Sequence, residues 1–318
     1  MAQITVQEAI DQALAEEMAR DPRVLLMGEG VATKRHALVE AFGGERVRNT
    51  PLAEGIIAGT AAGAAATGLR PVADLLFAPF LCYAMDELVN SAGKLRYLSG
   101  GQFSFPLVAI TMTGAGWCVG AQHNHNIEAW FVHSPGVKVV MPSSVADFKG
   151  LLKAAIRDDN PVLFFVDIGL AFVAGDVPDG ECLVPIGEAM VRRAGEDVTL
   201  ISYAKTVAVC EEAAQALAGQ GVSAEVIDLR TLKPLDEASI LASVRKTGRA
   251  IIVHEASRSC GVGAEIAATI ADKAFAALKA PVRRVAGPDA PAAASFPLEQ
   301  AFVPQASAVV DTALRFFA

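Results

Sequence analysis

Short apolar segments alternate with amphipathic helical segments in two successive series along this 318-residue chain. The segments that fit strands in the first series lie at 24–27, 71–76, 107–111, 137–141 and 162–166. Those of the second series lie at 198–203, 224–229, 250–254 and 282–286. Strands that alternate with helices in this way form parallel sheets with helices on both faces. The sequence therefore predicts an α/β fold with two parallel-sheet domains, residues 1–175 and 193–318, joined by a linker at 176–192.

The chain is richer in apolar residues and poorer in charge than most proteins of this class. Hydrophobic residues make up 53% of it and charged residues 19%, against a usual charged share of about 25%. The longest run without a charged residue, 97–127, is interrupted by glycine, glutamine, proline and histidine. It therefore does not fit a membrane-spanning helix, which needs about 20 consecutive apolar residues. We expect neither membrane insertion nor disorder, and we expect other subunits to cover the apolar surplus.

Charge and cysteine usage narrow the partners and the compartment. The formal net charge is −8 and no basic cluster occurs, so nucleic acid is not an expected partner. The N-terminal segment lacks the basic region and apolar core of a secretory signal. The five cysteines are scattered without a CxxC pair, which is typical of free thiols in a reducing compartment. We therefore expect a cytoplasmic protein.

The segment 50–54, TPLAE, has the pattern of a helix start. Thr50 fits a cap, Pro51 fits the first helical position, and Glu54 would face the positive end of the helix dipole. Two interpretations stay open for Glu54: a residue that only stabilises the helix, or an acid held beside a bound heterocycle. Small residues spaced by four along the helix would let another backbone come close, namely Gly55, Gly59 and Gly63.

A glycine-rich segment, 114–122, follows the strand at 107–111 and leads into His123 and His125. Loops after strands in open α/β sheets are where ligands bind. Three interpretations stay open: a surface loop, a metal site that lacks further ligands nearby, or an active-site imidazole that donates to or accepts from a substrate.

Two further segments have a structural and a functional interpretation. The turn at 155–161 either stops a helix before Pro161 or holds a cation through free carbonyls and one carboxylate. The Gly-Val-Gly at 261–263 matches only part of a dinucleotide fingerprint, which favours a plain helix start. No GxSxG or GxxxxGK[ST] motif occurs, so α/β-hydrolase and P-loop functions have no support.

Eight further segments occur in a fixed order along the chain: RVRNTPLAE (46–54), DELVN (86–90), KLRYLSGGQ (94–102), EAWF (128–131), HSPGVKVV (133–140), NP (160–161), VIDLRTLKP (226–234) and HEA (254–256). In this order and spacing, they resemble the beta subunits of the thiamine diphosphate-dependent 2-oxoacid dehydrogenases that act on pyruvate, branched-chain 2-oxoacids or acetoin. The resemblance covers almost the whole chain and implies a pyrimidine-binding-type domain followed by a transketolase C-terminal-like domain.

The resemblance assigns roles to individual residues. Glu54 would hydrogen-bond the cofactor's aminopyrimidine ring and share a proton with it, which activates the thiazolium carbon for attack on the substrate ketone. Leu52 would pack near the cofactor and Phe80 would stack on its pyrimidine. His123 would meet the substrate carboxylate or serve the acyl-transfer step. A structural potassium ion would be held by carbonyls and one acid at Leu107, Ala155, Ile156, Asp158 and Asn160.

The resemblance also implies partners. The Gly-Asp-Gly segment ending in Asn, which binds magnesium and the diphosphate in such enzymes, does not occur here and lies on the alpha subunit in the family. This chain would supply half of an active site in an alpha2-beta2 heterotetramer that passes the acyl group to a lipoyl-bearing dihydrolipoyl acyltransferase.

Several positions depart from the family pattern and put the substrate, a small 2-oxoacid or acetoin, in question more than the cofactor: Gly30, Leu76, Pro79, Asn124 and His125. Two alternatives therefore stay open. One is a thiamine diphosphate enzyme of transketolase or synthase type that is split into two chains, and the other is a non-catalytic partner of an alpha subunit.

Overall fold

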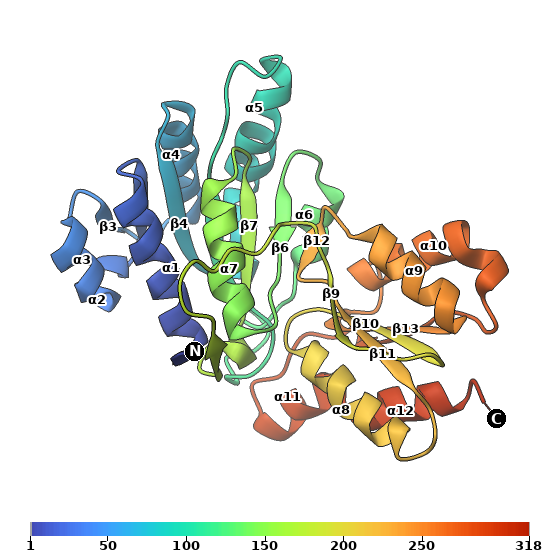
Figure 1. Cartoon of the computed structure of the whole chain (residues 1–318). Helices are drawn as coiled ribbons and strands as arrows, with labels where there is room; N and C mark the ends of the chain where they lie inside the picture. Colours follow the sequence, from blue (N-terminus) through green and yellow to red (C-terminus); the bar gives the residue numbers. More distant parts are fainter. Residues whose placement is uncertain (1, 318) are drawn as a thin grey trace. The chain divides into compact units, whose positions relative to one another are not determined.

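The computed structural model describes residues 2–317, which form two compact units (Figure 1). The first unit contains the chain up to Thr113 together with Trp130–Val140 and Ser144–Ile186. The second contains Gly114–Ala129, Met141–Ser143 and the chain from Gly187 onward. The expected α/β architecture with two predominantly parallel sheets is confirmed. The segment 114–129, which carries His123, belongs to the second unit although it lies within the first half of the sequence.

The main sheet of the first unit has its strands in the order β6-β7-β5-β4-β2-β3, and all neighbours are parallel. The strands are β2 (Val24–Glu29), β3 (Val47–Thr50), β4 (Arg70–Phe77), β5 (Val108–Thr113), β6 (Lys138–Val140) and β7 (Val162–Asp167). Those at its centre are buried almost along their whole length, as a sheet covered on both faces requires. A separate antiparallel pair joins β1 (Ala2–Thr5) to β8 (Ala174–Val177).

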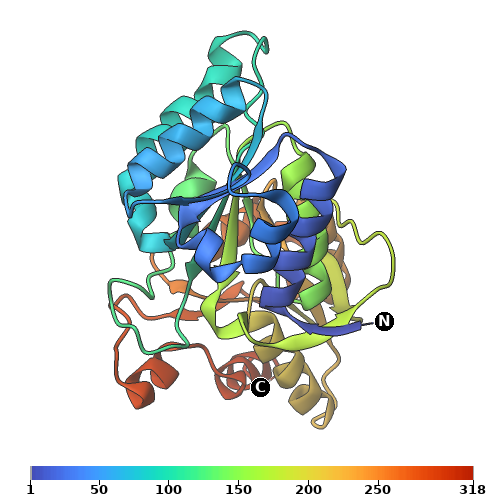
Figure 2. The same cartoon turned by 90° about the vertical axis from the view of Figure 1, so that its left-hand side faces the viewer.

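Helices α1 (Val6–Arg20) and α7 (Val145–Arg157) lie side by side in this unit, and both views show the contact (Figures 1 and 2). Helix α1 starts with a capping box, in which Thr5 and Glu8 bond each other's backbone N–H groups. The remaining helical segments of the unit are α2 (Val31–Lys34), α3 (His36–Phe42), α4 (Glu54–Ala66), η1 (Ala78–Ala84), η2 (Asp86–Ala92), α5 (Gly93–Leu98) and η3 (Ile168–Leu170), with α6 (Glu128–His133) at its border.

The start of helix α4 differs from the prediction. Thr50 does not cap it, because Thr50 is the last residue of strand β3 and pairs with Glu29 of β2. Helix α4 begins at Glu54, and its cap residue Ala53 offers no side-chain acceptor. Pro51 therefore ends a strand here instead of opening a helix. Glu54 keeps its predicted place in the first turn.

The second unit has a sheet in the order β14-β13-β10-β11-β9, parallel except for the β11–β9 pair. Its strands are β9 (Met190–Arg193), β10 (Val198–Ser202), β11 (Ala224–Asp228), β13 (Ala250–Ser257) and β14 (Arg283–Gly287). Its other elements are β12 (Thr231–Lys233), α8 (Thr206–Ala218), α9 (Glu237–Thr247), α10 (Val262–Ala274), η4 (Phe275–Ala277), α11 (Phe296–Phe302) and α12 (Ala306–Leu314). Across residues 2–317, no helix is both long enough and apolar enough to span a membrane.

The Gly-Val-Gly at 261–263 is a helix start, as predicted, and its glycines have a packing reason. Gly261 caps α10, and a Cβ on Gly263 would lie 2.4 Å from Nε2 of the fully buried His254. The glycine therefore makes room for an imidazole ring, which stacks on Tyr203 at 6.0 Å between ring centroids.

Candidate active site

Glu54 stands at the first position of helix α4 with its side chain half-buried. Among the described residues, no side chain or backbone group bonds to its carboxylate. Leu52, just before the helix, is 65% exposed. A carboxylate at a helix N-terminus is stabilised by the helix dipole, and here it also stays available to a hydrogen-bonding ligand.

The glycines of α4 hold it close to the segment that carries Phe80. A Cβ on Gly55 would lie 2.8 Å from the carbonyl oxygen of Tyr83, and one on Gly59 would lie 3.2 Å from Glu87. Tyr83 belongs to η1, and Phe80 is a half-buried residue of the same short helix. The expected close approach of another backbone is therefore present at Gly55, which sets the η1 backbone against the turn that begins with Glu54. At Gly59 the close neighbour is the Glu87 side chain of η2.

The third glycine lies on an open surface instead. A Cβ on Gly63 would meet nothing within 4 Å. In Figure 2, α4 (light blue) lies beside the helical segment that ends in α5 (teal), and α4 contacts η2, which contacts α5. These elements, η1 and the residues beside them leave a group of large apolar side chains exposed, which we call the α4–α5 surface: Leu52, Ile56, Tyr83, Leu95, Tyr97, Leu98 and Phe103. Part of the apolar surplus of the sequence is thus exposed in this region of the first unit.

His123 lies in the second unit, in the loop that links β5 to α6. Its side chain is half-buried, and its backbone N–H bonds the carbonyl of Gly120 at 3.2 Å. His125 is exposed. Within residues 2–317, no group of three or more His, Cys, Asp or Glu residues could hold a metal ion, so the metal-site interpretation of this histidine pair gains no support.

Two carboxylates that the sequence reasoning did not select hold this loop. Oε1 of Glu255 accepts from the backbone N–H of Ala115 at 2.6 Å, and Oε1 of Glu299 accepts from that of Cys118 at 3.0 Å. The sequence indicated Glu255 only as part of the HEA segment at 254–256, without a role. Glu299 lies in the short helix α11, about 180 residues beyond the loop, and no local pattern marks it.

A cavity of about 580 Å³ opens beside the loop within the second unit. The loop contributes Asn124, His125 and Asn126, strand β13 contributes Glu255, and the segment after β14 contributes Asp289. A cavity of this size suits a small organic molecule. Its lining combines the two acids with apolar side chains, among them Pro291 and Phe302.

The predicted potassium ligands lie near three cationic side chains of the chain itself, Arg70, Arg96 and Lys138. The carbonyl oxygens of Ile156 and Asp158 both accept from Arg70, at 3.0 and 3.1 Å. The Asp158 carboxylate is bonded by Lys138 and by Asn160. These contacts hold the pKa of Asp158 below its usual value, although burial alone would raise it. The Ala155 and Leu107 carbonyls each accept a backbone N–H. Each carbonyl keeps a second lone pair for a cation.

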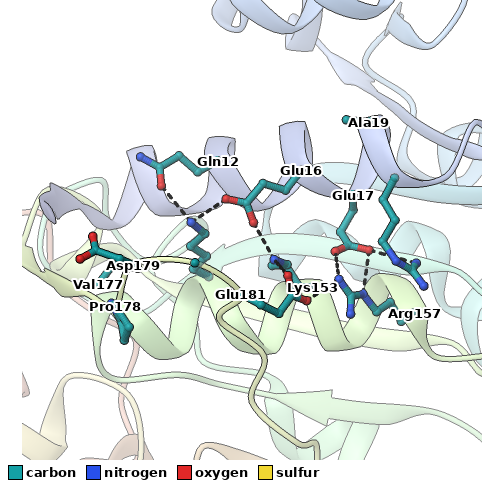
Figure 3. Close-up of a pocket in the computed structure, with 13 residues that line it drawn as sticks. Gln12, Glu16, Glu17, Ala19, Lys153, Arg157, Val177, Pro178, Asp179 and Glu181 are labelled. Atoms are coloured by element: carbon teal, nitrogen blue, oxygen red, sulfur yellow. Dashed lines mark hydrogen bonds and ion pairs between the residues drawn. The ribbon is translucent and has the colours of Figure 1, made fainter. Parts of the chain in front are cut away.

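A larger cavity of about 740 Å³, between α1, α7 and the segment 177–181, has a structural role (Figure 3). Lys153 is fully buried and pairs with Glu16 at 2.6 Å and Glu181 at 2.9 Å. Arg157 pairs with Glu17 at 2.6 Å and with Glu181 at 2.7 Å. Every basic group that lines this cavity meets a carboxylate of the chain itself, so its cations are neutralised within the fold.

Known protein families match almost the whole chain. The transketolase pyrimidine binding domain family matches residues 2–170, and the transketolase C-terminal domain family matches residues 187–309. A solved structure described as a split gene transketolase, inactive beta4 tetramer, superposes with a TM-score of 0.82 at 26% identity. That match covers 98% of this chain and 97% of the other.

Three curated relatives are similar over nearly the full length. The pyruvate dehydrogenase E1 component subunit beta-2 of Oryza sativa subsp. japonica is 44% identical, over 98% of this chain and 86% of its own. The beta subunit of acetoin:2,6-dichlorophenolindophenol oxidoreductase from Cupriavidus necator is 40% identical, over 98% and 97%. The 2-oxoisovalerate dehydrogenase subunit beta of Bacillus subtilis is 41% identical, over 97% and 96%. The chain therefore belongs to the beta-subunit family of the thiamine diphosphate-dependent 2-oxoacid dehydrogenases.

Proposed function

We propose that this chain is the beta subunit of a 2-oxoacid or acetoin dehydrogenase, which decarboxylates or cleaves its substrate and passes the acyl group to a lipoyl-bearing acyltransferase. The observation that carries the proposal is Glu54, an acid without a protein partner among the described residues, at the start of a helix packed through Gly55 and Gly59. The three relatives named above support the reaction class.

The residues around Glu54 fit a heterocyclic cofactor. Bound thiamine diphosphate supplies a nucleophilic carbon and an electron sink for decarboxylation. We assign to the Glu54 carboxylate the task of holding a proton shared with the aminopyrimidine ring. Leu52 and Phe80 give apolar contacts that exclude water from that hydrogen bond, which strengthens it. His123 takes the substrate carboxylate or serves the acyl transfer.

The partner proposal rests on the α4–α5 surface. Exposed apolar patches of this kind mark subunit interfaces, and Tyr97, Ile56 and Leu98 are 87%, 71% and 70% exposed. We propose that an alpha subunit, which binds the diphosphate and magnesium, covers this surface in an alpha2-beta2 heterotetramer. A dihydrolipoyl acyltransferase is the proposed acceptor. The proposed location is the cytoplasm, which fractionation of cells expressing the tagged chain would test.

A bound potassium ion near Asp158 is a separate proposal. It is supported by the second lone pairs of the Leu107, Ala155 and Ile156 carbonyls, whereas the Lys138 ammonium already neutralises the Asp158 carboxylate. Replacing sodium with potassium at constant ionic strength should raise the melting temperature of the wild-type chain. The same exchange should leave the melting temperature of Asp158→Asn unchanged. An equal rise in both proteins would contradict the proposed potassium site.

The Glu54→Gln variant tests the catalytic proposal in the assembled complex with an alpha subunit. Because the amide cannot share a proton with the cofactor ring, turnover of 2-oxoacids with an artificial electron acceptor should fall by about 10²–10⁴-fold. Assembly, measured by size-exclusion chromatography, should be unchanged. Glu40→Gln, an exposed acid in the same unit, is the matched control and should keep full activity. Normal turnover by Glu54→Gln would exclude the proposed role.

The same assay separates the alternatives. A split transketolase or synthase would act on sugar phosphates and leave 2-oxoacids untouched, an outcome made plausible by the split gene transketolase neighbour. A non-catalytic partner would copurify with an alpha subunit and yield a complex without turnover on any of these substrates.

A further inference from the structure

The loop that carries His123 is closed by two carboxylates in a nested arrangement. Oε1 of Glu255 accepts from Ala115 N at 2.6 Å and from Asn126 Nδ2 at 3.1 Å, so a single oxygen joins the two ends of the loop. Further in, Oε1 of Glu299 accepts from Cys118 N at 3.0 Å and from Asn124 Nδ2 at 2.8 Å. Both carboxylates come from elements beyond residue 250.

The inner carboxylate acts directly beside His123. Asn124 is 1% exposed and Glu299 is fully buried, so their hydrogen bond is shielded from water. The backbone N–H groups of His123 and Asn124 both bond the carbonyl of Gly120. The turn 120–124 is thus closed onto its first residue, Gly120, and held at its last residue, Asn124, by Glu299, and His123 lies between these two attachments.

The loop needs such an external support because its own backbone is strained. Cys118 has φ of +54°, a left-handed conformation that residues other than glycine rarely adopt. Oε2 of Glu299 also accepts from the Cys118 thiol at 3.2 Å, and this bond raises the pKa of the thiol, which stays protonated and keeps donating. Without Glu299, nothing among these contacts would hold the strained conformation.

The outer carboxylate is itself held in place by a cation. Lys205 forms an ion pair with Glu255 and also donates to the carbonyl of Ala115. At the far end of the loop, Tyr203 donates to the buried Glu128 at 2.7 Å. The second unit therefore fixes both ends of the loop and, through Glu299, its centre.

We propose that Glu299 is a positioning residue, which sets the place of the His123 imidazole by joining Cys118 to Asn124. The inference rests on the proposed function for its effect on catalysis, but not for the geometry. It gives the second unit a part in the reaction, because residues of that unit hold the active-site histidine in place.

Two substitutions of Glu299 separate the bonds. In Glu299→Gln the amide oxygen can replace Oε1 and accept from both N–H groups, so only the bond from the thiol is lost. In Glu299→Leu no acceptor remains, and the loop should leave its strained conformation. In the assembled complex, kcat should fall by about 100-fold for Glu299→Leu, the effect of a misplacement of about 1 Å. Glu299→Gln should keep kcat within about threefold of wild type, which corresponds to a rise of well under about 1 kcal/mol in the activation free energy.

A double-mutant cycle shows whether Glu299 acts through His123. If it does, adding Glu299→Leu to His123→Ala should lower kcat no further, because the group being positioned is already absent. Glu17→Leu is the matched control, since Glu17 is equally buried but belongs to the first unit. It should lower the melting temperature. Any effect of Glu17→Leu on kcat should be the same in the wild-type protein and in His123→Ala. Independent effects for Glu299 would overturn the proposal.

Hydrogen-exchange mass spectrometry of the full chain gives a readout that does not depend on activity. Amides of the segment 114–128 should exchange at least about tenfold faster in Glu299→Leu and at the wild-type rate in Glu299→Gln. Unchanged exchange in Glu299→Leu would overturn the positioning role even if activity fell. If Glu299→Leu exchanges faster but the wild-type complex turns over no 2-oxoacid, the proposed function is refuted. The role of Glu299 in holding the loop would still be confirmed.

Discussion

Glu54 begins a helix whose outer face is apolar and exposed, whereas His123 lies in a loop fastened by buried carboxylates. Around Glu54 the chain supplies close packing through Gly55 and leaves Leu52 and Ile56 in solvent. Around His123 it supplies a set of hydrogen bonds that the chain completes by itself. In the proposed assembly another surface completes the first region, whereas the hydrogen bonds of the second are formed within the chain. We therefore expect that assembly and the geometry around His123 can be disturbed separately.

The largest effect on assembly should come from placing a charge on the α4–α5 surface. Tyr97 is 87% exposed, so Tyr97→Asp should fold normally in the isolated chain. Burying the new carboxylate against an alpha subunit should weaken association by at least about 30-fold, the equivalent of one lost hot spot of about 2 kcal/mol. Analytical ultracentrifugation of mixed subunits measures this. Phe275→Asp, at a side chain 75% exposed in the second unit, is the control and should assemble normally. Equal association of both variants would exclude the α4–α5 surface as the interface.

The glycines of α4 test the packing around Glu54. Gly55→Ala places a methyl group 2.8 Å from the Tyr83 carbonyl and should lower the free energy of unfolding by about 1–3 kcal/mol. Gly63→Ala meets nothing within 4 Å and should raise it by about 0.5–1 kcal/mol in the isolated chain, because alanine loses less backbone entropy in a helix. Urea denaturation compares the two. If both variants are stabilised, α4 and η1 are not held together in the way described.

A smaller effect concerns the second region and pH. Burial lowers the pKa of His254 from 6.5 to about 4, so the folded chain keeps this imidazole neutral while the unfolded chain protonates it. His254 therefore leaves the free energy of unfolding unchanged well above pH 6.5 and lowers it as the pH drops from 6.5 toward 4. Between pH 6.5 and 5.5 the free energy of unfolding should decrease by about 1 kcal/mol. The non-titrating variant His254→Gln should lose this part of the pH dependence. An unchanged slope would refute the assignment to His254.

The sequence predicted the architecture because alternating strands and helices are local patterns. It singled out Glu54 because a motif surrounds that residue, and the role of Glu54 stays a prediction. It misplaced the start of α4, since pairing of Thr50 with β2 outweighed the local cap signal. It did not predict the support of the His123 loop. Glu299 meets Cys118 and Asn124 only after folding, and an acid in a short helix carries no pattern that announces a partner 175 or more residues away.

The central claim is that this chain holds half of a thiamine diphosphate site, and calorimetric titration of the cofactor with magnesium tests it directly. The isolated chain should show no saturable binding at concentrations that saturate the complex with an alpha subunit, and Glu54→Gln should weaken binding only in that complex. Tight, magnesium-dependent binding of thiamine diphosphate by the isolated chain would contradict the account.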